Sequence, residues 1–488
     1  MKRYKRLGIL VGVLVIACIA TFALTRYEEK KEQISNSDEV ILEIPTDSVQ
    51  SLSWEYESES LAFHKEETWL YDEDEAFPVD EEKVNELLEQ FEAFGVSFVI
   101  EEVEDYSQYG LAEPVCTIHL STEDTSYEIK LGDFSKMDSK RYVDIGDENV
   151  YLVSNDPLDQ FDVALSDLID HDEMPIFDQV TQIRFTGTES YSISYEEESN
   201  GSYSADDVYF TQEGNPLDTS RVESYLKALS SLDATDYVTY NATEEELQAY
   251  GLNAPELTVT VDYTYENEDG ESVPDTFALN ISRDPEELAA AEEGEDGDIS
   301  AYVRVGESQI VYRVSSDDRQ ALMAVSYDDL RHQEVFWADF DDVYQLDITL
   351  EGTQHTLTAV TQDGERAWYY GVKAEEVSNG ESEEAEATDE TLTEDTEEEQ
   401  QEALDITGLQ SALEALSADS FTSETPTEKE EISLTVYLDN ENFPKVQIGL
   451  YRYDGTYCLA VVDGESVSLV ARSSVMELVE AVQVIVLN

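Results

Sequence analysis

A six-residue motif, Tyr-Gly-Leu-x-x-Pro, occurs twice in this chain and constrains its fold more than any other feature. The first copy is Tyr109–Pro114 and the second is Tyr250–Pro255, so the two copies begin 141 residues apart. Each copy is followed by alternating apolar residues, a pattern that predicts a strand with one buried face. Because 141 residues is the size of a domain, the spacing predicts that related domains follow one another along the chain.

The motif itself has a structural explanation. In the second copy, Thr243–Glu246 is a capping-box pattern, which predicts a short helix that begins there. Gly251 is suited to the left-handed conformation after the end of a helix, Leu252 would then pack against Leu247, and Pro255 prevents the helix from continuing. We therefore interpret the motif as a helix stop before a strand, in preference to a ligand site.

Three stretches of the chain share one order of predicted elements. Each opens with period-2 strands, continues with an amphipathic helix that begins at an aspartate, and ends with four more strands and a last helix. In the first stretch the apolar stripe of the first helix extends to Phe94, and the last helix covers about 158–169. The third stretch lacks the Tyr-Gly-Leu motif, so we expect it to enter the corresponding strand through a shorter connection.

The aspartates that begin these helices support the repeat. They are good N-cap residues, and in each case the first apolar residue of the helix lies four positions later. The three positions are Asp80, Asp218 and Asp405. The patterns together predict an α+β protein with three tandem related domains, each a mainly antiparallel sheet with two helices.

The predicted domain limits follow from the repeat. The three domains are 41–177, 178–336 and 337–488. Within the third domain, residues 375–402 are rich in Glu and Thr and have few apolar side chains. Such a composition cannot form a core, so we expect a disordered acidic loop there.

The N-terminus predicts a membrane anchor. Residues 1–6 form a basic tail and residues 7–25 carry no charge; as a helix this run would be ~28 Å long, enough to cross a hydrocarbon core. The preceding basic residues place the tail in the cytoplasm and the bulk of the chain outside, after a stalk at 26–40. No signal-peptidase site precedes a polar start, which favours an uncleaved signal anchor. Lipidation of Cys18 stays open, although the apolar run continues beyond it.

The composition limits the partners of the main body. The chain has 27 Lys and Arg against 113 Asp and Glu, a formal net charge of −86. Such a surface repels the phosphates of nucleic acids and of anionic lipids, so we exclude both as direct partners of the main body. Three cysteines give no disulfide framework, and an extracytoplasmic protein without disulfides fits a Gram-positive bacterial surface.

The sequence predicts no catalytic, cofactor or metal site. The five histidines lack the spacing of a transition-metal site, and there is no C-x-x-C pair; the histidines are His64, His119, His171, His332 and His355. His171 lies in the acidic run 170–173, whose side chains are of types that contact divalent cations. A solvated acidic linker is the favoured interpretation of this run. The acidic runs 266–271 and 292–298 do not match a calcium loop. Cys116 lies on the apolar face of its strand, so we expect an inert core thiol.

The anchor, the W-x-Y…P-V-D order and the two Tyr-Gly-Leu motifs together give the chain a resemblance to a known family. It resembles the bacterial domain-of-unknown-function family DUF4340, over the first two domains through Tyr109–Pro114 and Tyr250–Pro255 and over the third by element order alone. The resemblance implies a membrane-anchored extracytoplasmic protein, often encoded near ABC-transporter components of the gliding-motility type. It implies no catalytic residues.

From these observations we expect a non-catalytic, single-pass protein of the cell membrane whose tandem domains bind or scaffold a membrane or cell-envelope partner, with an accessory role to an ABC transporter. Two alternatives stay open: a calcium- or cation-responsive surface module, and a cell-envelope hydrolase with an unrecognised site. The sequence leaves open the identity of the partner, the oligomeric state and the biological process.

Overall fold

The computed structural model describes residues 39–487 apart from 102, 154, 198–200, 268–269, 292–297, 363–364 and 372–402. The predicted tail, the anchor at 7–25, Cys18, most of the stalk and the acidic loop at 375–402 lie outside the described residues. Within the described part, no helix is both long enough and apolar enough to span a membrane.

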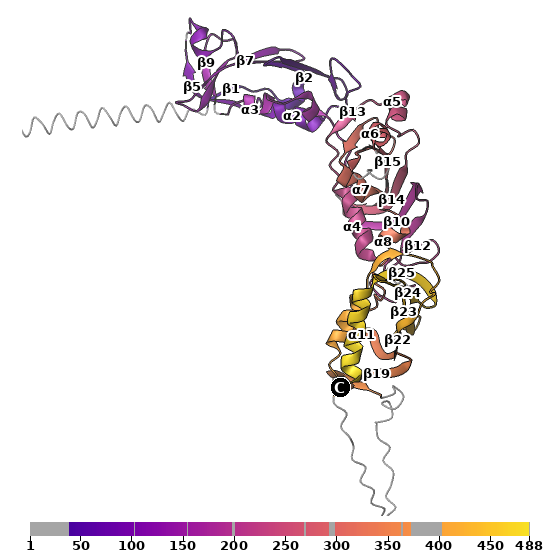
Figure 1. Cartoon of the computed structure of the whole chain (residues 1–488). Helices are drawn as coiled ribbons and strands as arrows, with labels where there is room; N and C mark the ends of the chain where they lie inside the picture. The colour runs from indigo at the N-terminus through magenta and orange to yellow at the C-terminus, as the bar shows by residue number, and fades with distance from the viewer. Residues whose placement is uncertain are drawn as a thin grey trace, which may run out of the picture. The chain divides into compact units, whose positions relative to one another are not determined.

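The chain forms two compact units. Of the described residues, the first unit comprises those from 39 to 173 together with 234–243 and 308–312, and the second comprises those in 174–233, in 244–307 and after 312. Three antiparallel sheets run through the described residues (Figure 1). The predicted α+β class with three mainly antiparallel sheets is confirmed, whereas the exact domain limits stay a prediction.

The first sheet has the order β1-β5-β9-β8-β7-β6-β2-β3-β4. Its strands are β1 (Glu39–Leu42), β2 (Val49–Tyr56), β3 (Glu59–Lys65), β4 (Trp69–Tyr71), β5 (Phe94–Ile100), β6 (Cys116–Thr122), β7 (Ser126–Ser135), β8 (Lys140–Asp144) and β9 (Val150–Val153). The helical segments are η1 (Thr46–Ser48), α2 (Glu81–Glu89), η2 (Tyr106–Tyr109), α3 (Leu158–Phe161) and η3 (Leu165–Leu168).

Two predictions for this sheet are wrong. Phe94 does not extend the stripe of α2; it begins β5, where it is buried and pairs with Leu42 of β1. Pairing with β1 on one side and with β9 on the other overrides the helical spacing. The single helix predicted at about 158–169 is instead two short segments, α3 and η3, because Asp162 leaves the helical conformation with φ −85° and ψ 65°.

The second sheet has the order β12-β11-β10-β14-β15-β16-β17-β13. Its strands are β10 (Gln179–Gly187), β11 (Ser192–Tyr195), β12 (Tyr209–Thr211), β13 (Tyr237–Thr239), β14 (Leu257–Glu266), β15 (Ser272–Arg283), β16 (Ala301–Val305) and β17 (Val311–Val314). The helices are α4 (Thr219–Ser230), α5 (Glu244–Ala249), α6 (Pro285–Ala290), α7 (Ser316–Met323) and α8 (Tyr327–Leu330).

The third sheet has the order β20-β19-β18-β22-β23-β24-β25-β21. Its strands are β18 (Val343–Leu350), β19 (Thr353–Gln362), β20 (Glu365–Tyr370), β21 (Ala418–Phe421), β22 (Glu430–Leu438), β23 (Lys445–Arg452), β24 (Tyr457–Val462) and β25 (Glu465–Ala471). The helical segments are η5 (Phe340–Asp342), α10 (Thr407–Glu414) and α11 (Arg472–Val486).

The three strand orders are the same when read in chain order, apart from the additional edge strand β1. The shorter connection predicted for the third sheet is confirmed. Eight residues join β21 to β22, whereas 17 residues join β13 to β14. One sheet therefore accepts either connection, and the Tyr-Gly-Leu motif belongs to the longer one.

The helix-stop interpretation of the motif is also confirmed. Gly110 has φ +70° and Gly251 has φ +75°, the left-handed conformation that glycine adopts without a Cβ penalty. The Leu252 N–H donates to the Leu247 carbonyl at 2.8 Å, the hydrogen bond of a Schellman motif. Leu111 N–H donates to the Tyr106 carbonyl at 3.1 Å in the first copy.

The core of the third sheet lies between its strands and two helices, α10 and α11; α11 is labelled beside the sheet in Figure 1. Leu413 and Leu478 of these helices are fully buried against Leu346 and Val436 of the sheet. Burying one leucine side chain stabilises the fold by about 1.5–3 kcal/mol. Tyr203, from the loop between β11 and β12, packs against this same core, so the second and third sheets share packing within the second compact unit.

Candidate functional site

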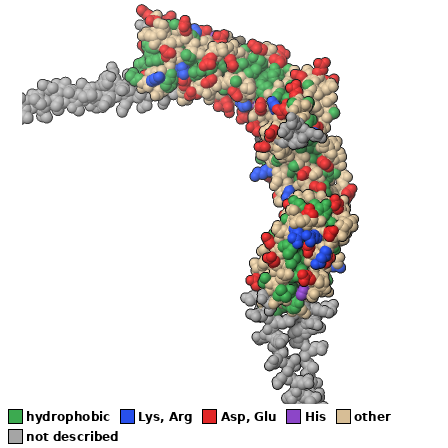
Figure 2. All heavy atoms as spheres, in the orientation of Figure 1, with side chains coloured by type: hydrophobic (Ala, Val, Ile, Leu, Met, Phe, Trp, Pro, Cys, Tyr) green, Lys and Arg blue, Asp and Glu red, His purple; other side chains and the backbone are tan. Residues whose placement is uncertain are grey.

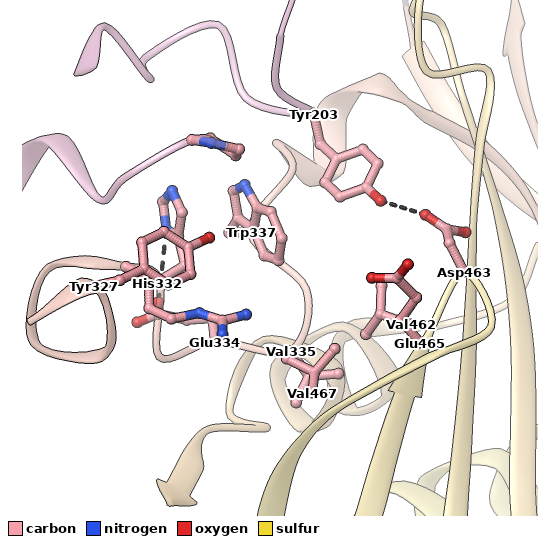
Figure 3. A pocket seen from close by; sticks show the side chains of 12 residues that line it. Tyr203, Tyr327, His332, Glu334, Val335, Trp337, Val462, Asp463, Glu465 and Val467 are labelled. Atoms are coloured by element: carbon pink, nitrogen blue, oxygen red, sulfur yellow. Dashed lines mark hydrogen bonds and ion pairs between the residues drawn. The ribbon is translucent and has the colours of Figure 1, made fainter. Parts of the chain in front are cut away.

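A pocket of about 290 Å³ lies within the second unit, where elements around the second and third sheets meet. Figure 3 shows its lining, with Trp337 placed between His332 and Tyr203. His332 and Glu334 follow the end of α8, and Asp463 occupies the turn between β24 and β25. The pocket is therefore built from loops and element ends that the sheets hold in place.

Tyr203 lines one side of the pocket. Its ring centroid is 5.0 Å from that of Trp337 and 5.0 Å from that of Phe443. Its hydroxyl donates a hydrogen bond to the Asp463 carboxylate (Figure 3). Burial and this hydrogen bond raise the pKa of the Tyr203 phenol well above its usual range, so the side chain stays a neutral donor.

A buried carboxylate organises the other side of the pocket. Asp207 is 4% exposed, and its Oδ1 lies 2.9 Å from His332 Nε2 while its Oδ2 accepts a hydrogen bond from the Ser202 hydroxyl. The Trp337 indole N–H donates to Ser202 Oγ at 3.3 Å, and the His332 ring stacks on Trp337 at 4.8 Å. This network satisfies the charge of Asp207, which would otherwise be costly to bury.

Ser202, His332 and Asp207 are the residue types of a hydrolase triad, but their connections differ. In a triad the histidine accepts the serine proton and the aspartate orients the histidine. Here the serine hydroxyl and the histidine ring both bind the same aspartate, so the histidine is not placed to activate the serine. The geometry favours a structural role for the cluster.

The chain segment after α8 crosses from the second sheet to the third. Val335 N–H donates to the Leu416 carbonyl at 2.9 Å, and Ala418 N–H donates to the Gln333 carbonyl at 2.7 Å. At the start of this segment, the Arg331 guanidinium lies over the ring of Phe421, 4.3 Å from the ring centroid. Backbone hydrogen bonds and a cation–π contact therefore fix this crossing.

One group of side chains near the pocket has atoms suited to a metal ion. These atoms come from Asp218, His332 and Glu334 and lie within 4.8 Å of one another. The sequence does not predict this group, because Asp218 and His332 are 114 residues apart and no local spacing connects them. The only available signal was the N-cap position of Asp218, which fixes one of the three groups at a helix start.

The other histidines lie apart from this pocket. His64 Nδ1 is 2.7 Å from Asp72 Oδ1, and His355 Nδ1 is 2.8 Å from the Tyr370 hydroxyl. His119 lies on β6, with its side chain exposed. His171 lies in the first unit, with its ring 6.0 Å from that of Tyr312.

The acidic run around His171 is more than a solvated linker. Asp172 N–H donates to the Tyr312 hydroxyl oxygen at 2.8 Å. The Asp172 carboxylate accepts a hydrogen bond from the Ser308 hydroxyl at 2.8 Å. Residues 308–312 belong to the first unit together with Asp172, so this part of the run is fixed by packing.

The prediction that Cys116 is a core residue is confirmed. Cys116 is 1% exposed, and burial raises the pKa of its thiol to about 12. Cys458 is also buried, and burial raises the pKa of its thiol to about 11. Both thiols are therefore protonated at neutral pH and unsuited to nucleophilic chemistry.

Comparison with protein families gives one result. A family model described as "Domain of unknown function (DUF4340)" matches residues 69–246 and 208–435. The first match begins with β4 and the second one residue before β12, which are equivalent strands of the first and second sheets. The second match extends to residue 435 in β22, so it reaches the third sheet, where the motif is absent. No curated protein and no solved structure matches the chain.

Proposed function

The chain belongs to the DUF4340 family of domains of unknown function, and we propose that it is a non-catalytic, membrane-anchored extracytoplasmic protein that binds or scaffolds a membrane or cell-envelope partner. The observation that carries the proposal is the junction at Tyr203, where a side chain of the second repeat packs into the core of the third. A scaffold needs such junctions, because it must hold its binding surfaces at a constant separation.

The polar chemistry of the junction supports the same role. The Tyr203 hydroxyl, the Asp207 carboxylate and the Ser202 hydroxyl oxygen are each engaged in a hydrogen bond with another segment, to Asp463, His332 and Trp337 in turn. Buried networks of this kind fix one arrangement of the surrounding elements when their members are satisfied. This geometry does not support the alternative of a cell-envelope hydrolase, since His332 and Ser202 both bind Asp207 and the histidine is not placed to activate the serine.

The negative charge of the chain favours a partner with a basic surface. Figure 2 shows acidic side chains across the visible surface of the described residues, with few basic ones among them. With a net charge of −86, association with a basic protein surface is accelerated by long-range attraction and weakened by salt. We propose a membrane protein with a basic extracytoplasmic face, of which an ABC-transporter component is the specific example. Anchoring through residues 7–25 would keep the acidic domains close to such a partner.

Crosslinking in intact membranes tests this function. A photoreactive amino acid is placed at Met137, which is 90% exposed in the turn between β7 and β8, and separately at Glu441, which is exposed between β22 and β23. The matched control carries it at Ile118, which is fully buried. We expect mass spectrometry to identify the same membrane or envelope protein from an exposed position in repeated experiments, with a yield that falls as salt rises. Finding no reproducible partner from either exposed position would contradict the proposal.

A further inference from the structure

The two ring nitrogens of His332 have different surroundings. Nε2 lies 2.9 Å from Oδ1 of Asp207, whose side chain is 3% exposed and whose other oxygen already accepts the Ser202 hydroxyl. Because an ionised carboxylate only accepts hydrogen bonds, the proton of a neutral imidazole belongs on Nε2. The lone pair is then on Nδ1, and the stacking on Trp337 fixes its direction.

The Nδ1 side of the ring faces the Glu334 carboxylate. Glu334 Oε2 is 3.9 Å from His332 Nδ1, and the ligand atoms of Asp218, His332 and Glu334 all lie within 4.8 Å of one another. A lone pair beside the Glu334 carboxylate, with an Asp218 ligand atom in the same group, is a suitable position for a cation. In metal sites, the second nitrogen of a coordinating histidine usually donates to a carboxylate, as Nε2 does here to Asp207.

We propose that Asp218, His332 and Glu334 bind a divalent transition-metal ion, with His332 Nδ1, one oxygen of each carboxylate and water as its ligands. An imidazole with two carboxylates suits ions of the Zn²⁺ class and does not suit ions that require thiolates. Zinc has ligand distances of about 2.0–2.2 Å, so two ligands in tetrahedral geometry lie about 3.4 Å apart. The 3.9 Å between His332 and Glu334 is near this value.

Movement of the Glu334 side chain would bring its carboxylate from 3.9 Å to the distance from His332 that a shared ion requires. The Glu334 side chain is 44% exposed and is free to rotate toward the other two groups. Asp218 is held in place, because its Oδ1 accepts the Ser220 N–H at 2.9 Å at the start of α4. Its Oδ2 lies 3.4 Å from Nε of Arg221, and that side chain is 40% exposed, so the ion would displace a solvated guanidinium.

Binding would have a mechanical consequence. Asp218 begins α4 in the second repeat, and Glu334 precedes Val335, whose N–H pairs with the Leu416 carbonyl beside the third sheet. An ion held by Asp218 and Glu334 would therefore stiffen the segment that connects the two sheets. This inference goes beyond the scaffold function and is independent of any protein partner.

Calorimetry with zinc tests the site directly. The full chain in detergent, treated with EDTA and dialysed, is titrated with ZnCl₂ in excess MgCl₂, which occupies the general acidic surface. We expect one saturable site per chain. Glu334→Gln and Asp218→Asn should each weaken zinc binding by at least about tenfold, since the second-shell partners of metal ligands alone contribute that much. Asparagine caps a helix as well as aspartate does, so the second variant keeps the fold of α4.

Asp80→Asn is the matched control. Asp80 caps α2 as Asp218 caps α4, and the position that corresponds to His332 is occupied by Asp170. This variant should bind zinc as the unaltered chain does, and bound Co²⁺ should give visible absorption that the Glu334 and Asp218 variants lose. Heats that do not saturate at one ion per chain would overturn the proposal, as would unchanged zinc affinity in both site variants.

Discussion

Two aspartates occupy equivalent places in the first and second repeats, and their surroundings show what differs between otherwise matching folds. Asp80 accepts the Glu82 N–H at 3.0 Å at the start of α2, and Asp218 accepts the Ser220 N–H at 2.9 Å at the start of α4. The backbone N–H of each donates to a leucine carbonyl in the last helical segment of its repeat, at 2.9 Å to Leu168 and at 3.0 Å to Leu330.

The two regions diverge immediately after these leucines. Leu168 is followed by Ile169 and Asp170, and the Asp170 N–H returns to the Pro78 carbonyl at 2.8 Å. Leu330 is followed by Arg331 and His332, which contact Phe421 and Asp207. The sheet and the capped helix are therefore the same in both repeats. The residues that follow the leucine differ, and in the second repeat they contact neighbouring segments and include His332.

The largest expected effect comes from removing Tyr203 from this junction. Tyr203→Ala should lower the free energy of unfolding of the second unit by about 2–4 kcal/mol, because it removes aromatic packing and a hydrogen bond to a carboxylate. Tyr203→Phe should cost less, since it removes only the hydrogen bond. Hydrogen exchange of the full chain measures both units at once. An equal loss of protection from hydrogen exchange in the first unit, or no loss of protection in the second, would show that the junction does not stabilise the second unit.

The two copies of the Tyr-Gly-Leu motif provide a second contrast. A Cβ at Gly110 would lie 2.8 Å from the Asp133 backbone nitrogen, whereas a Cβ at Gly251 would meet the Ser282 side chain at 3.2 Å. Gly251→Ala should cost about 1–2 kcal/mol for the left-handed conformation, and Gly110→Ala should cost about 1–3 kcal/mol more because of the clash. Denaturant unfolding of the two variants checks the order, and a larger loss for Gly251→Ala would contradict it.

The caps should behave alike despite their different neighbours. Asp80→Ala and Asp218→Ala should each destabilise their own unit by about 1 kcal/mol, and the corresponding asparagine variants should be close to neutral. Thermal unfolding in EDTA isolates the capping contribution from any bound metal. A loss at Asp218 several times that at Asp80 in EDTA would mean that Asp218 supports the fold through more than its cap.

The smallest effect is a pH dependence in the first unit. The hydrogen bond that protonated His64 donates to the Asp72 carboxylate raises the pKa of His64 above its ordinary value of 6.5. The contribution of this pair to stability is then fully present below pH 6.5 and is lost as the pH rises through the folded-state pKa. His64→Gln should remove this slope, which begins near pH 6.5 and extends above it, from denaturant unfolding curves. An unchanged slope in the variant would assign the dependence to another group.

The repeated fold could be predicted from the sequence because its signals are local. Period-2 strands, the helices capped by Asp80 and Asp218 and the glycine after α5 depend on neighbouring residues, and the structure has them where the sequence places them. The prediction of Asp405 as an N-cap is wrong by one residue: Ile406 occupies that position of α10, and Asp405 accepts the Thr407 N–H at 3.0 Å from just before it. The strands β5, β13 and β21 are not predicted from the sequence, because they are short or resemble the end of a helix and are fixed by pairing with distant strands; β13 and β21 are edges of their sheets, and β5 lies between β1 and β9. The junction was missed for the same reason: Tyr203, His332 and Asp463 meet only after two sheets have formed.

The central claim is that the second and third repeats form one rigid body through the Tyr203 junction. Double electron–electron resonance, which measures the distance between two spin labels, tests this claim. The labels are attached at Glu213→Cys and Glu441→Cys, two exposed positions beside the second and third sheets, in a Cys18→Ser background. We predict one narrow distance distribution that Tyr203→Ala broadens. A broad distribution in the chain with Tyr203 intact, unchanged by Tyr203→Ala, would contradict the claim.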